Sequence, residues 1–190
     1  MNILIVTAHP SKEGRTHLIA NTYAEIKHLN NHEVEIVDLY AEEYKTDNLS
    51  FSSDKNNITL TKIQKKFQEQ LLWAHEIVVV HPVWWGTAPA ILKNWVDLTF
   101  WPKIAYHYNE QGKLEKLLTK KTAKVFVTCG GPSWYHHFFF MPLLSFWKTC
   151  VFEFCGVDFV TLEVCGHLNT LTGEAREKHF DTFLKKIKKS

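Results

Sequence analysis

Short runs of apolar residues alternate along the chain with stretches in which apolar residues recur every three or four positions. The continuous runs predict five strands that are buried on both faces of a sheet, at residues 3–7, 34–37, 77–80, 125–128 and 159–164. The periodic stretches predict amphipathic helices at residues 16–29, 62–73, 89–96, 142–154 and 173–189. Thr16 is expected to cap the first helix. Two further long segments, residues 39–59 and 101–112, are expected to be irregular connections.

The alternation of strands and helices predicts an α/β fold in three layers, with a parallel sheet between two layers of helices. For one domain of 190 residues, the common order of five such strands is 2-1-3-4-5. Sheets of this kind bind ligands beyond the carboxyl ends of their strands, at the point where the strand order reverses. The loops after the first, third and fourth strands are therefore the segments in which a binding site is expected.

Composition narrows the classes of function. Lys and Arg number 22 and Asp and Glu number 20, which gives a formal net charge of +2. That balance argues against a strongly basic nucleic-acid binder and a strongly acidic carrier. The chain has no apolar run long enough to span a membrane and no basic leader before its first strand, so a cytoplasmic location is expected. The four cysteines form no CxxC pair, which predicts free thiols and no metal site.

The loop after the first strand contains side chains that suit an anion. Hydrogen-bond donors are offered by Ser11, Arg15, Thr16 and His17, and a helix N-terminus adds backbone N–H groups and a favourable dipole. The loop has neither the GxGxxG pattern of a dinucleotide site nor the GxxxxGK[ST] pattern of a nucleotide phosphate loop. A flavin phosphate or pyrophosphate fits these residues, and an ordinary capped turn fits them equally well.

Aromatic residues and glycines dominate the other two loops. The third strand is followed by Pro82-Val83-Trp84-Trp85-Gly86, whose tryptophans suit a flat heteroaromatic ring, with core packing as the alternative. The fourth strand ends in Thr128-Cys129-Gly130-Gly131, where the glycines are expected to permit positive φ and close approach of the backbone to a ligand. Candidate proton donors follow at Tyr135, His136 and His137, and a solvated loop tip is the favoured explanation for at least one of the histidines.

Several longer segments carry a recognisable pattern: ILIVTAHP at residues 3–10, HPVWWGTAPAILKNWVDLTF at 81–100, AYHY at 105–108, TCGG at 128–131 and FCG at 154–156. With these segments the chain resembles the flavodoxin-like NAD(P)H:quinone oxidoreductase family. The segments are spread over nearly the whole chain, and the second of them is long and specific. The resemblance implies a flavodoxin-like fold, a homodimer, a tightly bound flavin and two-electron reduction of that flavin by NAD(P)H.

The resemblance also implies roles for individual residues. The flavin phosphate would be held by His9, Arg15, Thr16 and His17, and the isoalloxazine by Pro82, Val83, Trp84, Trp85 and Gly86. The pyrimidine edge of the ring would be met by Thr128, Gly130, Gly131 and Tyr135. Charge on the reduced flavin would be supported by Tyr135, Gly130 and Gly131, without any covalent bond to the protein. The substrate pocket would be lined by Trp101, Ile104, Tyr106, Tyr108 and His136.

The implied function is a flavin-dependent NAD(P)H:quinone oxidoreductase, in which a hydride passes from NAD(P)H through flavin N5 to a quinone in two ping-pong half-reactions. FMN and FAD both remain open as the flavin, with FAD slightly favoured on the overall resemblance. One alternative is a regulatory flavoprotein subunit of a potassium-efflux transporter, with a membrane partner. The others are an azo- or nitroreductase and a one-electron flavodoxin carrier, which the charge balance disfavours. No nucleic-acid partner is expected.

Overall fold

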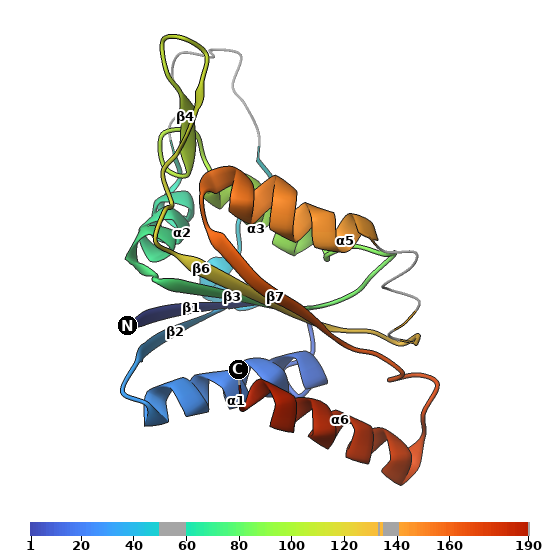
Figure 1. Cartoon of the computed structure of the whole chain (residues 1–190). Helices are drawn as coiled ribbons and strands as arrows, with labels where there is room; N and C mark the ends of the chain where they lie inside the picture. Colours follow the sequence, from blue (N-terminus) through green and yellow to red (C-terminus); the bar gives the residue numbers. More distant parts are fainter. Residues whose placement is uncertain (50–59, 133, 135–140, 190) are drawn as a thin grey trace.

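The computed structural model describes residues 1–49, 60–132, 134 and 141–189, and it has the three layers expected from the sequence (Figure 1). The central sheet consists of parallel strands: β1 (Asn2–Thr7), β2 (Glu33–Asp38), β3 (Glu76–Pro82), β6 (Thr122–Thr128) and β7 (Asp158–Cys165). Their spatial order is β2-β1-β3-β6-β7, which confirms the predicted order 2-1-3-4-5 for these strands. Each predicted strand lies within the bounds of one of them.

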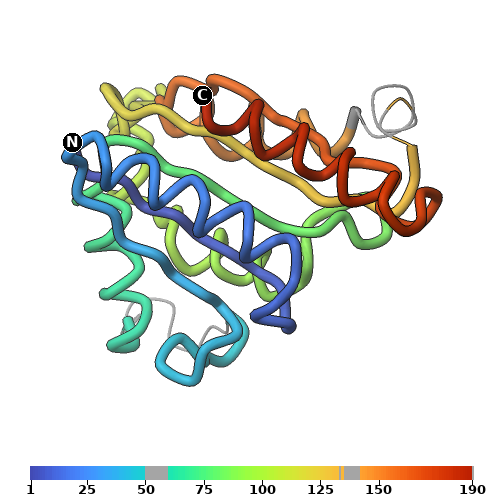
Figure 2. Tube along the Cα trace, turned by 90° about the horizontal axis from the view of Figure 1, so that it is seen from below, coloured from blue at the N-terminus to red at the C-terminus, as the bar shows by residue number. Residues whose placement is uncertain are grey.

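Helices cover both faces of the sheet. On one face lie α1 (Arg15–Leu29) and α6 (Gly173–Ile187), which Figure 2 shows running side by side across it. The other face is covered by α2 (Lys62–Trp73), α3 (Ala90–Thr99), α5 (Met141–Ser145) and the helical segment η2 (Phe146–Glu153) (Figure 1). Within the described residues, no helix is long and apolar enough to cross a membrane.

Side-chain alternation along the strands divides the apolar core into two halves. Leu4 and Val6 of β1 pack with residues of α2, α3 and η2, whereas Ile3 and Ile5 pack with residues of α1 and α6. Because helices cover both faces, both sets of side chains are buried. The strand therefore has a continuous apolar sequence instead of an alternating one.

A buried polar network lies on the α1 side of the sheet. The hydroxyl of Tyr23 donates a hydrogen bond to Oε1 of Glu76 over 2.7 Å. Nζ of Lys124 lies 3.0 Å from the Tyr23 hydroxyl and 3.4 Å from Oε2 of Glu76. Burial raises the pKa of Tyr23, and the hydrogen bond to Glu76 raises it further. The network thus joins α1, β3 and β6 through groups that satisfy one another's charges.

Three segments differ from the sequence-based expectation. Residues 101–112 are not wholly irregular, because β4 (Tyr106–Tyr108) pairs antiparallel with β5 (Leu114–Lys116). Residues 39–49 include a short 3₁₀ helix, η1 (Glu42–Tyr44), and residues 50–59 lie outside the described part of the chain. The predicted helix at 142–154 is π-helical from Phe146 to Glu153. A strand or 3₁₀ helix of only three residues is too short to show a hydrophobic period. A π-helix departs from the 3.6-residue repeat on which helix prediction relies.

Candidate functional site

Three loops meet at the carboxyl edge of the sheet, after β1, β3 and β6. The amide of Val83 donates a hydrogen bond to the carbonyl of Thr128 over 2.8 Å and joins the loops after β3 and β6. The hydroxyls of Thr16 and Thr128 lie 3.2 Å apart and join the segments after β1 and β6. The ring centroids of His9 and Trp84 are 6.3 Å apart, so the loops after β1 and β3 are also neighbours. The structure thus brings the three predicted cofactor segments together where the strand order reverses.

The first loop presents the N-terminus of α1 to this edge. The amide of Ser11 donates to Nδ1 of His9 over 3.0 Å, and the amide of Gly14 donates to the carbonyl of Ser11 over 3.1 Å. Gly14 is the N-cap residue, so the prediction that Thr16 caps the helix is wrong. A glycine has no side chain that could accept from the first amides, and the first helical turn contains no acidic residue. These amides and the helix dipole therefore favour an anion.

His17 is a second feature that suits an anion. The residue is only 7% exposed, and its Nε2 lies 3.4 Å from Oδ2 of Asp38 at the end of β2. In the part of the chain that the structure describes, neither ring nitrogen has a hydrogen-bond partner. A buried polar group without a partner costs about 1–3 kcal/mol, which a bound phosphate would offset. Arg15 differs from His17, because it pairs with Glu177 of α6 and lies 5.4 Å over the Phe180 ring.

The second loop is a tight turn with backbone strain. The amides and carbonyls of Trp84 and Thr87 hydrogen-bond each other over 3.0 Å, and the two residues between them, Trp85 and Gly86, have φ values of 51° and 77°. This is the pattern of a type I′ turn. The left-handed conformation costs a non-glycine residue roughly 1–2 kcal/mol. Trp85 is fully exposed, and Trp84 is 40% exposed, so both rings are available to a ligand.

The third loop is held by the segment that follows β7. The carbonyls of Gly130 and Gly131 accept hydrogen bonds from the amides of Asn169 and His167, over 3.1 and 2.6 Å. Neither glycine has a positive φ, so the conformational freedom that the sequence offers here is not used. A Cβ at Gly130 would lie 2.5 Å from Nδ2 of Asn169. At Gly131, no described residue comes within 4 Å of an added Cβ.

Sequence reasoning missed the two residues that hold this loop. His167 and Asn169 follow directly after β7, so the signal that could have revealed them is the same strand-end position that identified the other loops. His167 also has a positive φ of 63°, which is unusual for a residue other than glycine. Tyr135, His136 and His137 lie outside the residues that the structure describes, and their predicted roles stay predictions.

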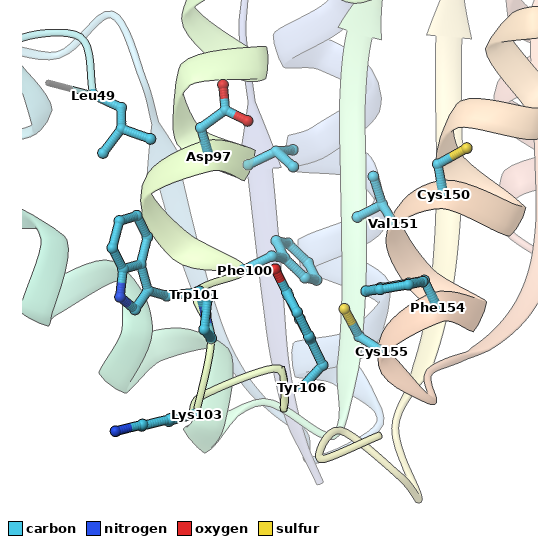
Figure 3. Close-up of a pocket in the computed structure, with 12 residues that line it drawn as sticks. Leu49, Asp97, Phe100, Trp101, Lys103, Tyr106, Cys150, Val151, Phe154 and Cys155 are labelled. Carbon is cyan, nitrogen blue, oxygen red and sulfur yellow. The ribbon is translucent and has the colours of Figure 1, made fainter. Parts of the chain in front are cut away.

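A separate apolar cavity of about 680 Å³ lies between α3, the segment after it and the end of η2 (Figure 3). Trp101 and Tyr106, two of the residues predicted for the substrate pocket, line this cavity. The ring of Tyr106 packs edge-on against Phe154, with centroids 4.9 Å apart. Ile104 and Tyr108 belong to the same segment, and Tyr108 is largely exposed. Trp101 and Tyr106 thus line an apolar cavity, and the assignment of Ile104, Tyr108 and His136 to a substrate pocket stays a prediction.

This aromatic cavity is remote from the three loops within one chain. The amide of Leu117 donates to the carbonyl of Ala105, and the amide of Leu118 donates to that of Cys155, just before β6 begins. These bonds fix the cavity beside the amino ends of the strands, and Figure 1 shows β4 standing above that edge of the sheet. The structure of a single chain does not bring Trp101 and Tyr106 together with the predicted cofactor residues.

Comparison with known proteins identifies the family. The profile described as a flavodoxin-like fold matches residues 1–190. An uncharacterised NAD(P)H oxidoreductase of Haemophilus influenzae is 30% identical over 184 residues, which cover 93% of this chain and 89% of that protein. An FMN-dependent NADH:quinone oxidoreductase of Coprothermobacter proteolyticus is 30% identical over 96% of this chain and 94% of its own length. The chain belongs to the flavodoxin-like NAD(P)H:quinone oxidoreductase family.

Solved structures share the fold of this chain. A crystal structure of a protein from Streptococcus mutans has a TM-score of 0.84 and 25% identity over the whole of both chains. An FMN-dependent NADH-azoreductase of Bacillus anthracis, solved in complex with FMN, has a TM-score of 0.80 over 100% of this chain and 97% of that one. Because the sequence identity is 17%, this second similarity shows a shared fold alone.

Proposed function

We propose that this member of the family is an FMN-dependent NAD(P)H:quinone oxidoreductase. The observation that carries the proposal is the meeting of three loops at one edge of the sheet. One offers an uncapped helix N-terminus beside His17, whose ring nitrogens make no hydrogen bond to a described residue. The second offers an exposed Trp85, and the third offers Gly131, where no described residue comes within 4 Å of an added Cβ. These features suit the phosphate, the flat ring and the polar ring edge of a flavin mononucleotide. Two relatives at 30% identity, named as an NAD(P)H oxidoreductase and an NADH:quinone oxidoreductase, support the same activity.

The residues that would hold the cofactor follow from these positions. The first amides of α1 and the ring of His17 would bind the phosphate, and the turn at Trp85 would lie against the ring system. The backbone at Gly130 and Gly131 would meet the pyrimidine edge, where oriented N–H groups support negative charge. A bound FMN supplies reversible two-electron redox chemistry between a nicotinamide and a quinone. Tyr135 would add a hydroxyl at the same edge.

FMN replaces FAD as the preferred cofactor. The resemblance alone slightly favoured FAD, but the C. proteolyticus relative is named as FMN-dependent. The donor set supports that choice, because one helix N-terminus and one buried histidine without a hydrogen bond to a described residue suit a single terminal phosphate. The choice between NADH and NADPH stays open, and a cytoplasmic location remains part of the proposal.

A homodimer would explain why two parts of the predicted site are separate in one chain. The aromatic cavity at Trp101 and Tyr106 is apolar and lies away from the chain's own cofactor loops. If a second copy packs on this region, the cavity of one subunit can serve the cofactor edge of the other. Sedimentation of the FMN-loaded chain at micromolar concentration should therefore show a dimer, and a monomer would contradict this part of the proposal.

The main experiment measures cofactor uptake and both half-reactions. The purified chain should bind FMN, identified by mass after release with heat. Anaerobic stopped-flow mixing with NADH or NADPH should bleach the flavin absorbance, and mixing with a quinone should restore it. A chain that takes up neither FMN nor FAD would refute the proposal. A chain that is reduced by the nicotinamide but reoxidised only by an azo or nitro compound would assign a different acceptor. The relatives' names favour the enzyme over the transporter subunit, which stable co-purification with a membrane partner would instead support.

A further inference from the structure

His81 is a buried histidine at the base of the loop that would contact the flavin ring. It is 0% exposed and is followed directly by Pro82, the last residue of β3. Nδ1 of His81 lies 2.8 Å from the carbonyl oxygen of Pro82, and its Nε2 lies 3.0 Å from Nε1 of Trp147. An indole N–H can only donate, so Nε2 is the acceptor and Nδ1 carries the proton that is donated to Pro82. Both ring nitrogens of His81 are therefore used within the protein.

The surroundings of His81 also fix its charge. Burial lowers the pKa of His81 to about 4, although the hydrogen bond to Pro82 acts in the opposite direction. The ring is therefore neutral at pH 7, and its protons are not available to a substrate. His81 can influence a bound cofactor through the geometry that it imposes on its neighbours.

The peptide unit between Pro82 and Val83 is held at both ends. Its carbonyl accepts from His81, and its N–H, on Val83, donates to the carbonyl of Thr128 over 2.8 Å. Because a peptide unit is planar, two hydrogen bonds on opposite sides fix the orientation of its plane. The next residues form the turn that contains Trp85 in its left-handed conformation. The orientation of that turn therefore depends on the peptide plane that His81 helps to hold.

Trp147 connects this peptide to the π-helical segment η2. The indole is 0% exposed and stacks on Phe152, with ring centroids 5.6 Å apart and an angle of 22° between the planes. Both residues belong to the π-helical stretch Phe146–Glu153. Such stretches are rare and occur frequently at functional sites. The indole N–H is thus delivered to His81 from a rigid, fully packed position.

We propose that Trp147 and His81 are positioning residues for the cofactor, which orient the flavin-contacting loop by holding the Pro82 carbonyl. The inference rests on the proposed function, because it assigns a role to residues behind the proposed flavin site. Neither side chain has to touch the flavin. Their effect passes through one peptide unit to the turn at Trp85.

The first test concerns the hydrogen bonds themselves. Long-range ¹H–¹⁵N NMR of the histidine rings at pH 7 should show His81 as the Nδ1–H tautomer, with assignment by comparison with His81→Leu. In Trp147→Phe, the Nε2 of His81 loses its donor, and its nitrogen shift should change. The opposite tautomer in the parent, or an unchanged His81 signal in Trp147→Phe, would overturn the inference without reference to the cofactor.

The second test separates positioning from ordinary stability. Trp147→Phe leaves Nε2 of the buried His81 unpaired. The double variant Trp147→Phe/His81→Leu removes both members of that hydrogen bond and should recover part of the thermal stability, although the Pro82 carbonyl then lacks its donor. Neither variant retains the complete arrangement, so both should bind FMN about tenfold more weakly, the effect of losing one hydrogen bond. The visible circular dichroism of bound FMN should change in both. Trp95→Phe replaces another buried tryptophan, on α3, and is the matched control. It should leave the FMN affinity and the visible circular dichroism of bound FMN unchanged.

The outcomes distinguish this inference from the proposed function. If the parent chain binds no FMN, the proposed function fails, and the positioning role fails with it. If the parent binds FMN and the double variant regains parental affinity and spectrum together with its stability, the pair is only part of the core and the inference alone fails. A double variant that regains stability but not FMN affinity or the parental spectrum supports the positioning role.

Discussion

Substitution of Gly131 separates the stability of the fold from binding of the cofactor. No described residue comes within 4 Å of a Cβ added at Gly131, and the residue does not have the positive φ that would strain a side chain. Gly131→Ala should therefore raise the free energy of unfolding by about 0.4–1 kcal/mol, because alanine has fewer conformations than glycine in the unfolded chain. The methyl group would instead enter the space that we assign to the flavin ring edge.

The expected loss of FMN affinity can be estimated from the contacts at risk. A ring displaced by one methyl group would lose or lengthen a hydrogen bond to the loop backbone, which is worth about 0.5–1.5 kcal/mol for neutral partners and about 1.5–3 kcal/mol for charged ones. Gly131→Ala should thus weaken FMN binding about tenfold. Gly131→Val is larger and branched at Cβ, and it should weaken binding about a hundredfold.

The assay combines urea unfolding of the cofactor-free chain with fluorescence titration of FMN. Gly112→Ala is the matched control, because its Cβ would also meet nothing within 4 Å among the described residues. Gly112 has a φ of 73° in the β4–β5 turn, so this variant should lose about 1 kcal/mol of stability and keep parental FMN affinity. Parental FMN affinity in Gly131→Val would refute the assignment of this loop to the cofactor. Unfolding of Gly131→Ala would refute the stability argument.

Four further outcomes follow from other parts of the structure. His17→Ala should weaken FMN about tenfold or more but leave riboflavin, which lacks the phosphate, unchanged in parallel titrations. Glu76→Gln removes the carboxylate that faces the buried Lys124 and should lower the free energy of urea unfolding by about 3 kcal/mol, most of which the triple variant Glu76→Leu/Lys124→Met/Tyr23→Phe should recover. Burial lowers the pKa of His81 from 6.5 to about 4, so the neutral ring stabilises the fold fully above pH 6.5 and less as the pH falls towards 4. Between these pH values, the free energy of unfolding of the parent should fall by about 3 kcal/mol more than that of His81→Leu. Tyr135→Phe should keep FMN bound and slow both half-reactions about tenfold in stopped-flow measurements.

Most of the fold was predictable because burial on two faces leaves a strong local signal. A strand such as β3, buried along its whole length between two layers of helices, must be apolar at successive positions. The strand order then follows from the few arrangements that such alternating elements adopt. The β4–β5 hairpin escaped prediction, and η2 was predicted as a helix but not as a π-helix. The strands of the hairpin have only three residues each, and a π-helix departs from the 3.6-residue repeat on which the prediction relies.

The site was predictable to the level of loops but not of individual contacts. Each cofactor segment follows a strand, and parallel strands end at one edge, so the topology alone brings His9, Trp84 and Thr128 together. The partners of these loops come from positions that no local pattern connects. Asp38 lies beside His17, and Trp147 donates to His81 across 66 residues of sequence. Such pairs depend on the packing of whole elements, and a single sequence contains no record of that packing.

The aromatic segment shows a different limit of sequence reasoning. Its residues were assigned to the same site as the cofactor loops, and the structure confirms that Trp101 and Tyr106 line a cavity. The same structure places that cavity beside the amino ends of the strands, whereas the loops lie at the carboxyl ends. Pairing with a second copy would reconcile the two observations, because a two-fold axis can set one edge of a sheet against a different region of its partner. On that proposal, a variant at Trp101 should alter the quinone reaction while the cofactor affinity of its own chain is unchanged. In a mixed dimer, the defect should then appear in the partner's site.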